Sequence, residues 1–187
     1  METANIIFIT GGVRSGKSNY AEALAERLSE HHNQRNLHYI ACGVASDPEM
    51  HMRIQKHQQK RAEALVEWET WEQPHSLRKI ADEFSNKDIL VLDCLTTLVN
   101  NYMFLLQMTD ENEIISCVLQ DIDHLSVMCG QFIIVSNEVF QGMPHSDSLT
   151  LKYQRMLGMI HQHIVEKADH AYLIESDIPI CKKGAIL

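Results

Sequence analysis

An eight-residue loop near the start of the chain constrains the fold more than any other segment, and it matches the pattern G-x-x-x-x-G-K-[ST] in full: Gly11-Gly12-Val13-Arg14-Ser15-Gly16-Lys17-Ser18. The apolar run at 5–10 predicts a buried strand before the loop, and residues 19–30 predict a helix after it. A loop between a strand and a helix N-terminus points several backbone N–H groups at one spot, where the helix dipole adds positive potential. The loop therefore predicts binding of a nucleoside triphosphate by all eight of its residues.

Two side chains of this phosphate loop have specific expected roles. Lys17 is expected to reach the β- and γ-phosphates and to take part in catalysis, and the Ser18 hydroxyl is expected to bind Mg²⁺. Asp93 ends a second apolar run at 89–92, a position from which a carboxylate usually holds Mg²⁺ directly or through water. A strand-terminal Asp is also a common helix cap. Because a phosphate loop is present, we favour the metal role for Asp93.

Short apolar runs alternate with longer helical stretches along the rest of the chain. The runs predicted as strands are Ile6–Ile9, Leu37–Cys42, Ile89–Cys94, Phe132–Ser136 and Ala171–Glu175. The stretches predicted as helices are Asn19–Glu30, Pro48–Leu65, Pro74–Phe84, Glu111–Cys129 and Leu149–Ala168. This alternation predicts a three-layer α/β fold of the P-loop nucleotide-binding kind, with a mainly parallel central sheet. Ligands of such sheets bind at the carboxyl ends of the strands, so the phosphate loop, Asp93 and Asn137-Glu138 should converge there.

Composition narrows the classes of function. The 187 residues carry a net charge of −9 and no basic tract, which argues against a nucleic-acid-binding surface. The five cysteines form no C-x-x-C pair, which favours reduced thiols over a disulfide framework or a zinc site. No signal-peptide pattern opens the chain, and no apolar run approaches about 18 residues. We expect one domain over residues 1–187, a cytoplasmic location and no membrane insertion.

Three further features admit two interpretations each. His57 lies in a basic helical stretch, where an imidazole either attacks an α-phosphate or simply sits on a solvated helix face. Trp68 and Trp71 either stack on a base or belong to the core, and Glu72 beside them is a candidate hydrogen-bond acceptor for a base or ribose. The polar segment 141–148 is either a substrate lid or a tolerated surface loop.

The ordered motifs along the whole chain resemble those of one enzyme family. The opening reads T-G-G-x-R-S-G-K-S with Ala21-Glu22 after it, and the matching segments that follow are Tyr39-Ile40-Ala41, Glu49-Met50-x-x-Arg53-Ile54-x-x-His57, Trp68-x-Thr70-x-Glu72, Asp93-Cys94-Leu95-Thr96-Thr97, Val135-Ser136-Asn137-Glu138-Val139, Ala168-Asp169-His170-Ala171 and Gly184. Together they resemble the bifunctional adenosylcobinamide kinase / adenosylcobinamide-phosphate guanylyltransferase family of cobalamin biosynthesis. This set is far more specific than a phosphate loop alone.

The resemblance implies two reactions. A nucleoside triphosphate, ATP or GTP, phosphorylates the aminopropanol hydroxyl of adenosylcobinamide, and GTP then gives its GMP to that phosphate, forming adenosylcobinamide-GDP and pyrophosphate. In the family a histidine carries GMP covalently, and the matching residue is His57. The family's guanine-nucleotide contacts correspond to the phosphate loop, Gln58-Gln59-Lys60-Arg61, Glu72 and Asp93. The resemblance also implies a homotrimer with nucleotide sites near the subunit interfaces.

The chain departs from the family pattern in several places: the family's Arg-Pro reads Arg61-Ala62, the spacing from His57 to Trp68 is longer, and three further positions differ in residue type. Phe140 stands where the family has the first Gly after S-N-E-V, and Gln154 and His161 replace an Arg and an Asn of a later motif. These three positions lie outside the residues expected to bind nucleotide, so they bear on the corrinoid.

Two other functions compete with the family's. One is a P-loop kinase of another small molecule, and the other is a GTP-binding module without catalysis. A regulatory GTPase should carry a guanine-reading N-K-x-D segment at a strand end, whereas Asn86-Lys87-Asp88 precedes a strand and has the wrong spacing. Only the bifunctional enzyme requires a nucleotidyl-histidine.

Overall fold

The structure is a computed structural model that describes residues 4–31, 35–43, 52, 55, 57–59, 61–64, 66–139 and 147–187. The described strands form one seven-stranded sheet in the order β3-β2-β4-β5-β1-β6-β7, parallel except for the antiparallel pair β6–β7. The strands are β1 (Asn5–Gly11), β2 (Asn36–Ala41), β3 (Trp68–Glu72), β4 (Asp88–Asp93), β5 (Gln131–Asn137), β6 (His170–Glu175) and β7 (Ile178–Lys183).

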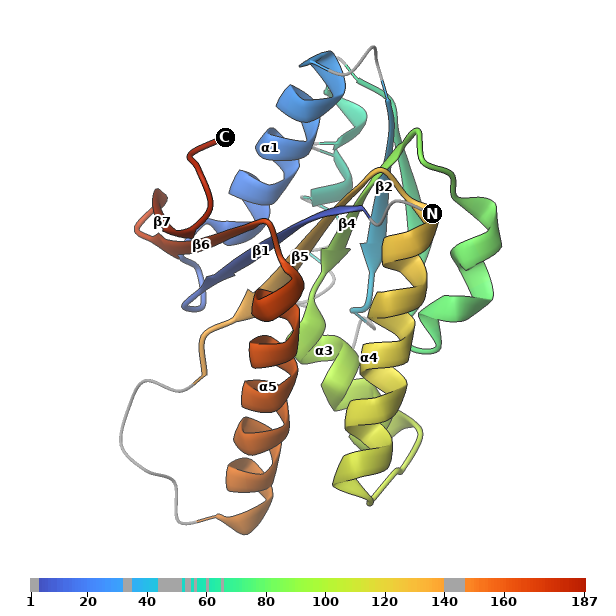
Figure 1. Cartoon of the computed structure of the whole chain (residues 1–187), viewed down its shortest axis with the longest axis vertical. Coiled ribbons are helices and arrows are strands. Elements are labelled where there is room, and N and C mark those ends of the chain that lie inside the picture. The colour runs from blue at the N-terminus through green and yellow to red at the C-terminus, as the bar shows by residue number, and fades with distance from the viewer. Residues whose placement is uncertain are drawn as a thin grey trace.

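Helices cover both faces of this sheet, as Figure 1 shows. The helix α1 (Lys17–His31) packs on one face, and α3 (Leu95–Asn100), α4 (Glu111–Met128) and α5 (Ser148–Lys167) pack on the other. A 3₁₀ helix, η1 (Leu77–Glu83), lies against α4, and a π-helical turn, η2 (Asn101–Leu105), continues α3. The three-layer α/β fold predicted from the sequence is therefore confirmed.

The core strands are buried on both faces because their apolar runs have no polar face to expose. Along β1, Ile6 and Phe8 pack with the helices on one side, and Ile7 and Ile9 pack with α1 on the other. Residues 89–92 of β4 are likewise fully buried. This continuous burial is the arrangement expected of parallel strands covered by helices on both sides.

Strand order brings the expected site residues to one edge of the sheet. Strand β5 lies between β1 and β4, and in its register Gly11 is the partner of Asn137 and Asp93 is the partner of Val135. The backbone N–H of Glu138 donates to the carbonyl of Gly11 over 2.9 Å. The predicted convergence of the phosphate loop, Asp93 and Asn137-Glu138 is thus confirmed.

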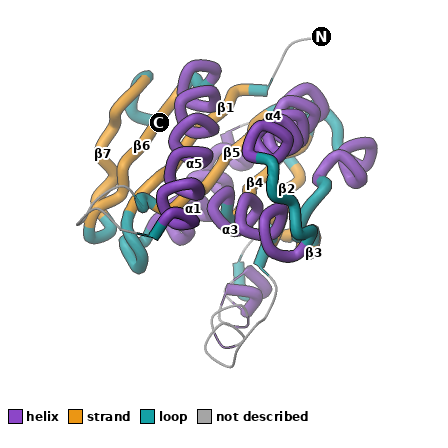
Figure 2. Tube along the Cα trace, turned by 90° about the horizontal axis from the view of Figure 1, so that it is seen from below, coloured by secondary structure: helices purple, strands orange, loops and turns teal. Residues whose placement is uncertain are grey.

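The five predicted strands all occur, but the sheet has two more that the sequence analysis missed. Both are edge strands with broken hydrophobicity: β3 alternates Trp with polar residues, and β7 contains Pro179 and is largely exposed. β6 and β7 lie together at one side of the sheet (Figures 1 and 2). Edge strands need less burial than central ones, so a search for continuous apolar runs passes over them.

Three of the five predicted helices lie within two residues of α1, α4 and α5. The prediction over 74–84 was too long, because only 77–83 are helical, in 3₁₀ form, with Ser76 before them in the left-handed region. The predicted helix at 48–65 falls partly outside the described residues; those described from 52 to 62 are helical. The short helix α3 was not predicted. In the part of the chain described here, no helix has the length and apolar character needed to cross a membrane.

Candidate nucleotide site

The phosphate loop has the form its sequence predicts, with its basic side chain folded over it. Lys17 Nζ donates to the carbonyl of Gly12 over 3.0 Å, and the N–H of Ser15 donates to the same carbonyl over 3.2 Å. Lys17 and Ser18 begin α1 and are 4% and 7% exposed, whereas Gly12 and Val13 lie at the surface. The loop therefore presents backbone to solvent while its charged group stays inside the turn, close to where phosphates bind in such loops.

A hairpin turn packs against the outside of this loop. Ser176 and Asp177, which join β6 to β7, both have positive φ, at 51° and 63°, as a tight two-residue hairpin turn requires. The N–H of Asp177 donates to the carbonyl of Ser15 over 2.9 Å. A Cβ added to Gly16, whose φ is +92°, would come within 1.7 Å of the Asp177 carboxylate. The backbone angle at this position favours glycine, and a larger residue would also require the Asp177 side chain to move.

Asp93 lies at the same edge of the sheet, and its carboxylate is held from the neighbouring strand. The Tyr39 hydroxyl on β2 donates to Asp93 Oδ2 over 2.7 Å. Burial, the negative charge of Asp93 and their hydrogen bond raise the pKa of Tyr39 well above its usual value, so the phenol remains a donor. Asp93 thus keeps the position expected of a metal-binding carboxylate.

The turn that follows Asp93 is fixed by small polar side chains. Asn137 Nδ2 donates to Thr96 Oγ1 over 2.8 Å, and Cys94 Sγ lies 3.0 Å from that hydroxyl and 3.1 Å from Thr97 Oγ1. Burial, with the charge of Asp93, raises the pKa of the Cys94 thiol. Cys94 is therefore a neutral packing and hydrogen-bonding residue here rather than a nucleophile.

The structure places His57 beside the helix that begins at the phosphate loop. Its Nδ1 atom lies 3.2 Å from Glu22 Oε1, and Glu22 lies one turn after Ser18 on α1. Arg61 Nη1 donates to the same Glu22 oxygen over 3.2 Å. The His57 side chain is 21% exposed, while those of Glu22 and Arg61 are 2% and 5% exposed. His57 is thus a partly buried residue with a charged partner, not a solvated surface histidine.

The other residues predicted to contact nucleotide differ in their exposure to solvent. Gln58 and Gln59 are exposed, and Lys60 lies outside the described residues. Arg61 faces inward, where its guanidinium stacks over the Tyr39 ring at 3.7 Å from the centroid. Glu72 ends β3 and is exposed at the strand edge that also carries Asp93, because Ala41 of β2 is the register partner of both.

The two tryptophans belong to the core on opposite faces of the sheet. Trp71 packs with the cluster under α4, and Trp68 packs with the cluster under α1. Trp68 Nε1 also donates to Glu26 Oε1 over 3.2 Å. The two tryptophans are three residues apart, and successive side chains of a strand point to opposite faces of the sheet. Their rings therefore lie on different faces and do not form a common stacking surface.

Two of the three further positions that depart from the family pattern have structural partners. His161 packs edge-on against Phe8, and its Nε2 lies 2.7 Å from Ser136 Oγ. Burial lowers the pKa of His161 to about 4, so it is neutral near pH 7. Gln154 Nε2 donates to the carbonyl of Val139 over 2.6 Å, just beyond β5. Phe140 and most of the polar segment 141–148 lie outside the described residues.

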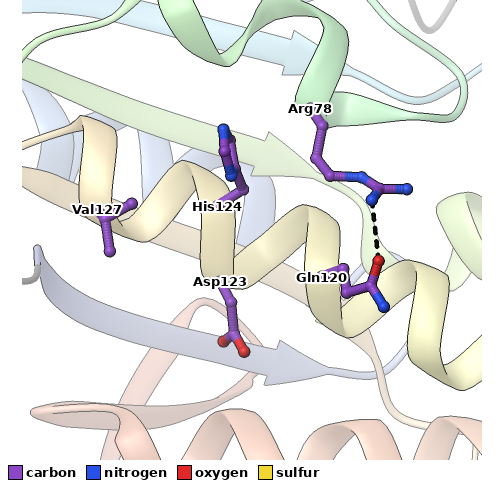
Figure 3. Close-up of a pocket in the computed structure, with 5 residues that line it drawn as sticks. All are labelled: Arg78, Gln120, Asp123, His124 and Val127. Carbon is purple, nitrogen blue, oxygen red and sulfur yellow. Dashed lines mark hydrogen bonds between the residues drawn. The ribbon is translucent and has the colours of Figure 1, made fainter.

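The outer surface of α4 carries a shallow hollow that is separate from the candidate nucleotide site. It is lined by Arg78, Gln120, Asp123, His124 and Val127 (Figure 3). Arg78 donates to Gln120 and to the buried carboxylate of Asp121 there, so its charge is engaged within the protein. None of the residues predicted for the nucleotide site lines this hollow.

The sequence analysis assigned no individual role to three residues of the site. Glu22 and Tyr39 were named only as members of segments that match the family pattern, and Asp177 was not named at all. For Glu22 a signal was present, since an acidic residue four positions after Ser18 must share its face of the helix. The contacts of Tyr39 and Asp177 depend on strand pairing and on a hairpin, which local sequence does not reveal.

A phosphate loop at the end of β1, an aspartate at the end of β4 and a strand between them define a P-loop nucleotide-binding protein. Solved structures of similar fold agree: flagellar accessory protein FlaH from Methanocaldococcus jannaschii has a TM-score of 0.51 at 13% identity, covering 98% of this chain and 80% of that one. The KaiC-like protein PH0186 from Pyrococcus horikoshii has a TM-score of 0.52 at 11% identity, covering 98% and 81%. At such identities the likeness concerns the fold alone.

Sequence comparison identifies the family. The family model described as cobinamide kinase / cobinamide phosphate guanyltransferase matches residues 7–181, and the chain belongs to this family of bifunctional enzymes. The bifunctional adenosylcobalamin biosynthesis protein CobU of Salmonella typhimurium is 29% identical over 185 residues, covering 94% of this chain and 98% of the relative. CobP of Pseudomonas aeruginosa, of the same description, is 31% identical over 180 residues, covering 94% and 96%. The family resemblance seen in the sequence motifs is confirmed.

Proposed function

We propose that this chain phosphorylates adenosylcobinamide and then transfers GMP from GTP to the product, with His57 carrying GMP between the two substrates. Membership of the family supports the pair of activities. The observation on this chain that carries the proposal is the position of His57, held against Glu22 one helical turn after Ser18. A plain kinase needs no nucleophilic histidine beside its phosphate loop, whereas a nucleotidyltransferase with a covalent intermediate does.

Phosphorylation relies on the phosphate loop. Its backbone N–H groups and the N-terminus of α1 bind the phosphates of ATP or GTP, and Lys17 leaves the carbonyl of Gly12 to contact the transferred group. The corrinoid hydroxyl attacks the γ-phosphorus and releases its proton to water. The bond from that phosphorus to the bridging β-phosphate oxygen breaks, and the nucleoside diphosphate leaves with the electron pair. Lys17 stabilises the charge on the equatorial oxygens during this step.

The residues expected to hold Mg²⁺ offer a suitable donor set. Ser18 supplies a hydroxyl at the start of α1, and Asp93 supplies a carboxylate at the same edge of the sheet. Such hard oxygen ligands are those Mg²⁺ prefers, with substrate phosphates and water completing its shell. When bound there, Mg²⁺ neutralises charge on the phosphates. Within the described residues no cluster of three or more His, Cys, Asp or Glu side chains offers a separate metal site.

A two-label assay with purified protein tests both activities. The wild type should move γ-labelled phosphate to adenosylcobinamide and α-labelled GMP to adenosylcobinamide phosphate. Lys17→Ala should lose both transfers, because both need a bound triphosphate, whereas His57→Ala should keep the first and lose the second. GMP transfer by His57→Ala at the wild-type rate would overturn the covalent route, and a wild type inactive in both assays would overturn the whole proposal.

Two further properties rest on the family resemblance, and a third, the cytoplasmic location, rests on the five unclustered cysteines. We propose that the chain is a cytoplasmic homotrimer and that Gln58, Gln59, Lys60, Arg61 and Glu72 contribute to binding of the guanine nucleotide. Light scattering coupled to gel filtration measures the mass directly, and a monomer would contradict the trimer. Because Arg61 is packed against Glu22 and Tyr39, its substitution should also disturb His57.

A further inference from the structure

A buried carboxylate stands behind His57. Glu22 is buried, and burial of an ionised carboxylate is costly unless a cation and hydrogen bonds compensate for the lost water. Arg61, which is also buried, provides that cation, since its Nη1 donates to Glu22 Oε1 over 3.2 Å. Glu22 is therefore held as an ionised acceptor, and the atom that it presents to His57 Nδ1 is that same oxygen.

Arg61 is itself held by the ring of Tyr39. Its guanidinium lies over the Tyr39 ring at 3.7 Å, which suits a cation–π contact, and the Tyr39 hydroxyl donates to Asp93. His57 and Arg61 are four residues apart in a helical segment, so both face α1. A continuous row of contacts thus runs from the carboxyl end of β4 to the imidazole.

We propose that Glu22 is the positioning residue for His57: it accepts the Nδ1 proton and leaves the Nε2 lone pair to attack the α-phosphorus of GTP. This inference rests on the covalent route proposed above. A carboxylate that only accepts hydrogen bonds requires the proton on Nδ1, and the partner of one ring nitrogen sets the state of the other. Arg61 and Tyr39 act on His57 only through Glu22.

The chemical step balances with these groups. The Nε2 lone pair forms a bond to the α-phosphorus, the bond to the bridging oxygen of the β-phosphate breaks, and pyrophosphate leaves with that electron pair. The ring becomes cationic while its Nδ1 proton stays hydrogen-bonded to Glu22, whose charge stabilises it. An oxygen of adenosylcobinamide phosphate then attacks the same phosphorus, the P–N bond breaks, and His57 returns to its first state.

The first test compares Glu22→Gln with Glu26→Gln. Glu26 lies one turn further along α1 and accepts a hydrogen bond from Trp68 rather than contacting His57, so it is a matched control. Glu22→Gln should slow formation of the GMP adduct from GTP by about 10- to 100-fold, the range found when the carboxylate partner of a metal-bound histidine is removed. Its affinity for GTP should stay within about twofold of wild type, because Glu22 does not touch the nucleotide in this account. Glu26→Gln should behave as wild type.

The second test determines which ring nitrogen of His57 carries the proton and which one carries GMP. In the wild type, nitrogen-correlated NMR should show the proton of His57 on Nδ1, and the GMP adduct should be linked through Nε2. Tyr39→Phe, which keeps the ring under Arg61, should retain both signatures. An adduct on Nδ1, a proton on Nε2, or an unchanged adduct rate in Glu22→Gln would overturn the inference.

The two proposals fail separately. A wild type that forms no adduct from GTP removes the covalent route, and the tautomer then decides alone whether Glu22 orients His57. A wild type that forms the adduct beside a Glu22→Gln variant of equal rate keeps the covalent route and removes the role of Glu22. If Glu22→Gln does not fold, the linkage and the tautomer of the wild type still give the answer.

Discussion

Substitution of Gly16 by Ala tests how the phosphate loop is held in shape. Gly16 has φ of +92°, and a Cβ there would come within 1.7 Å of Asp177 Oδ1 and 3.3 Å of Asp177 Cα. Gly12, in the same loop, has no atom within 4 Å of its added Cβ and no positive φ. Gly12→Ala is therefore a matched control in the same loop.

The structure sets the size of the effect on the free energy of unfolding. A left-handed backbone angle costs an L-residue about 1–2 kcal/mol, before any displacement of the hairpin at Asp177. An alanine of compatible geometry instead gains about 0.4–1 kcal/mol, because it restricts the unfolded chain. Gly16→Ala should thus be less stable than wild type by at least about 1–2 kcal/mol, and Gly12→Ala should equal or slightly exceed wild type.

Urea denaturation followed by circular dichroism measures both variants, and GTP titration shows whether the loop still binds. The double variant Gly16→Ala/Asp177→Gly is compared with Asp177→Gly alone, because Asp177 itself has φ of 63° and a glycine there relieves that angle. Against this reference, alanine at position 16 keeps the cost of its backbone angle but no longer meets the carboxylate, so the double variant should recover only part of the loss. Full recovery would show that φ at Gly16 costs nothing, and a stable Gly16→Ala that binds GTP normally would refute the whole reasoning.

Two further predictions concern the core. The pKa of His161 is about 4 in the folded protein, whereas in the unfolded chain it has its ordinary value of about 6.5. Between these pH values only the unfolded chain binds the proton, so the free energy of unfolding falls by roughly 3 kcal/mol as the pH is lowered from 6.5 to 4. His161→Asn should lack this component in urea denaturation at pH 7 and pH 4, and a pH slope equal to that of wild type would contradict it. Tyr102 donates to the buried Asp121 over 2.7 Å and accepts from the N–H of Ser76. Tyr102→Phe should therefore lose about 1–2 kcal/mol of unfolding free energy, and no loss would show that both partners find other bonds.

Much of this fold was readable from the sequence because its core strands are buried on both faces. Continuous apolar runs such as 89–92 leave little choice of element, and the phosphate loop fixes a strand before it and a helix after it. The strands β3 and β7 could not be found in this way. Their identity depends on neighbours that supply hydrogen bonds, and a half-exposed edge strand carries only a weak pattern of its own.

The candidate site likewise contains residues that the local sequence identifies and residues that only tertiary contacts identify. Residues inside one motif, from Gly11 to Ser18, were found together because their roles follow from one loop. His57 was ambiguous from its surroundings in sequence, since its neighbours are exposed glutamines and basic residues. What distinguishes it is a contact with Glu22, 35 residues earlier, and tertiary contacts of that separation leave no local trace.

Mass spectrometry of the intact protein and its peptides after incubation with GTP and Mg²⁺ tests the central claim most directly, with His57→Ala beside the wild type. We expect one GMP on the wild type, located on the peptide that contains His57, and none on the variant. A wild type that binds GTP but carries no GMP, or an adduct that persists in His57→Ala, would contradict the assignment of His57 as the carrier.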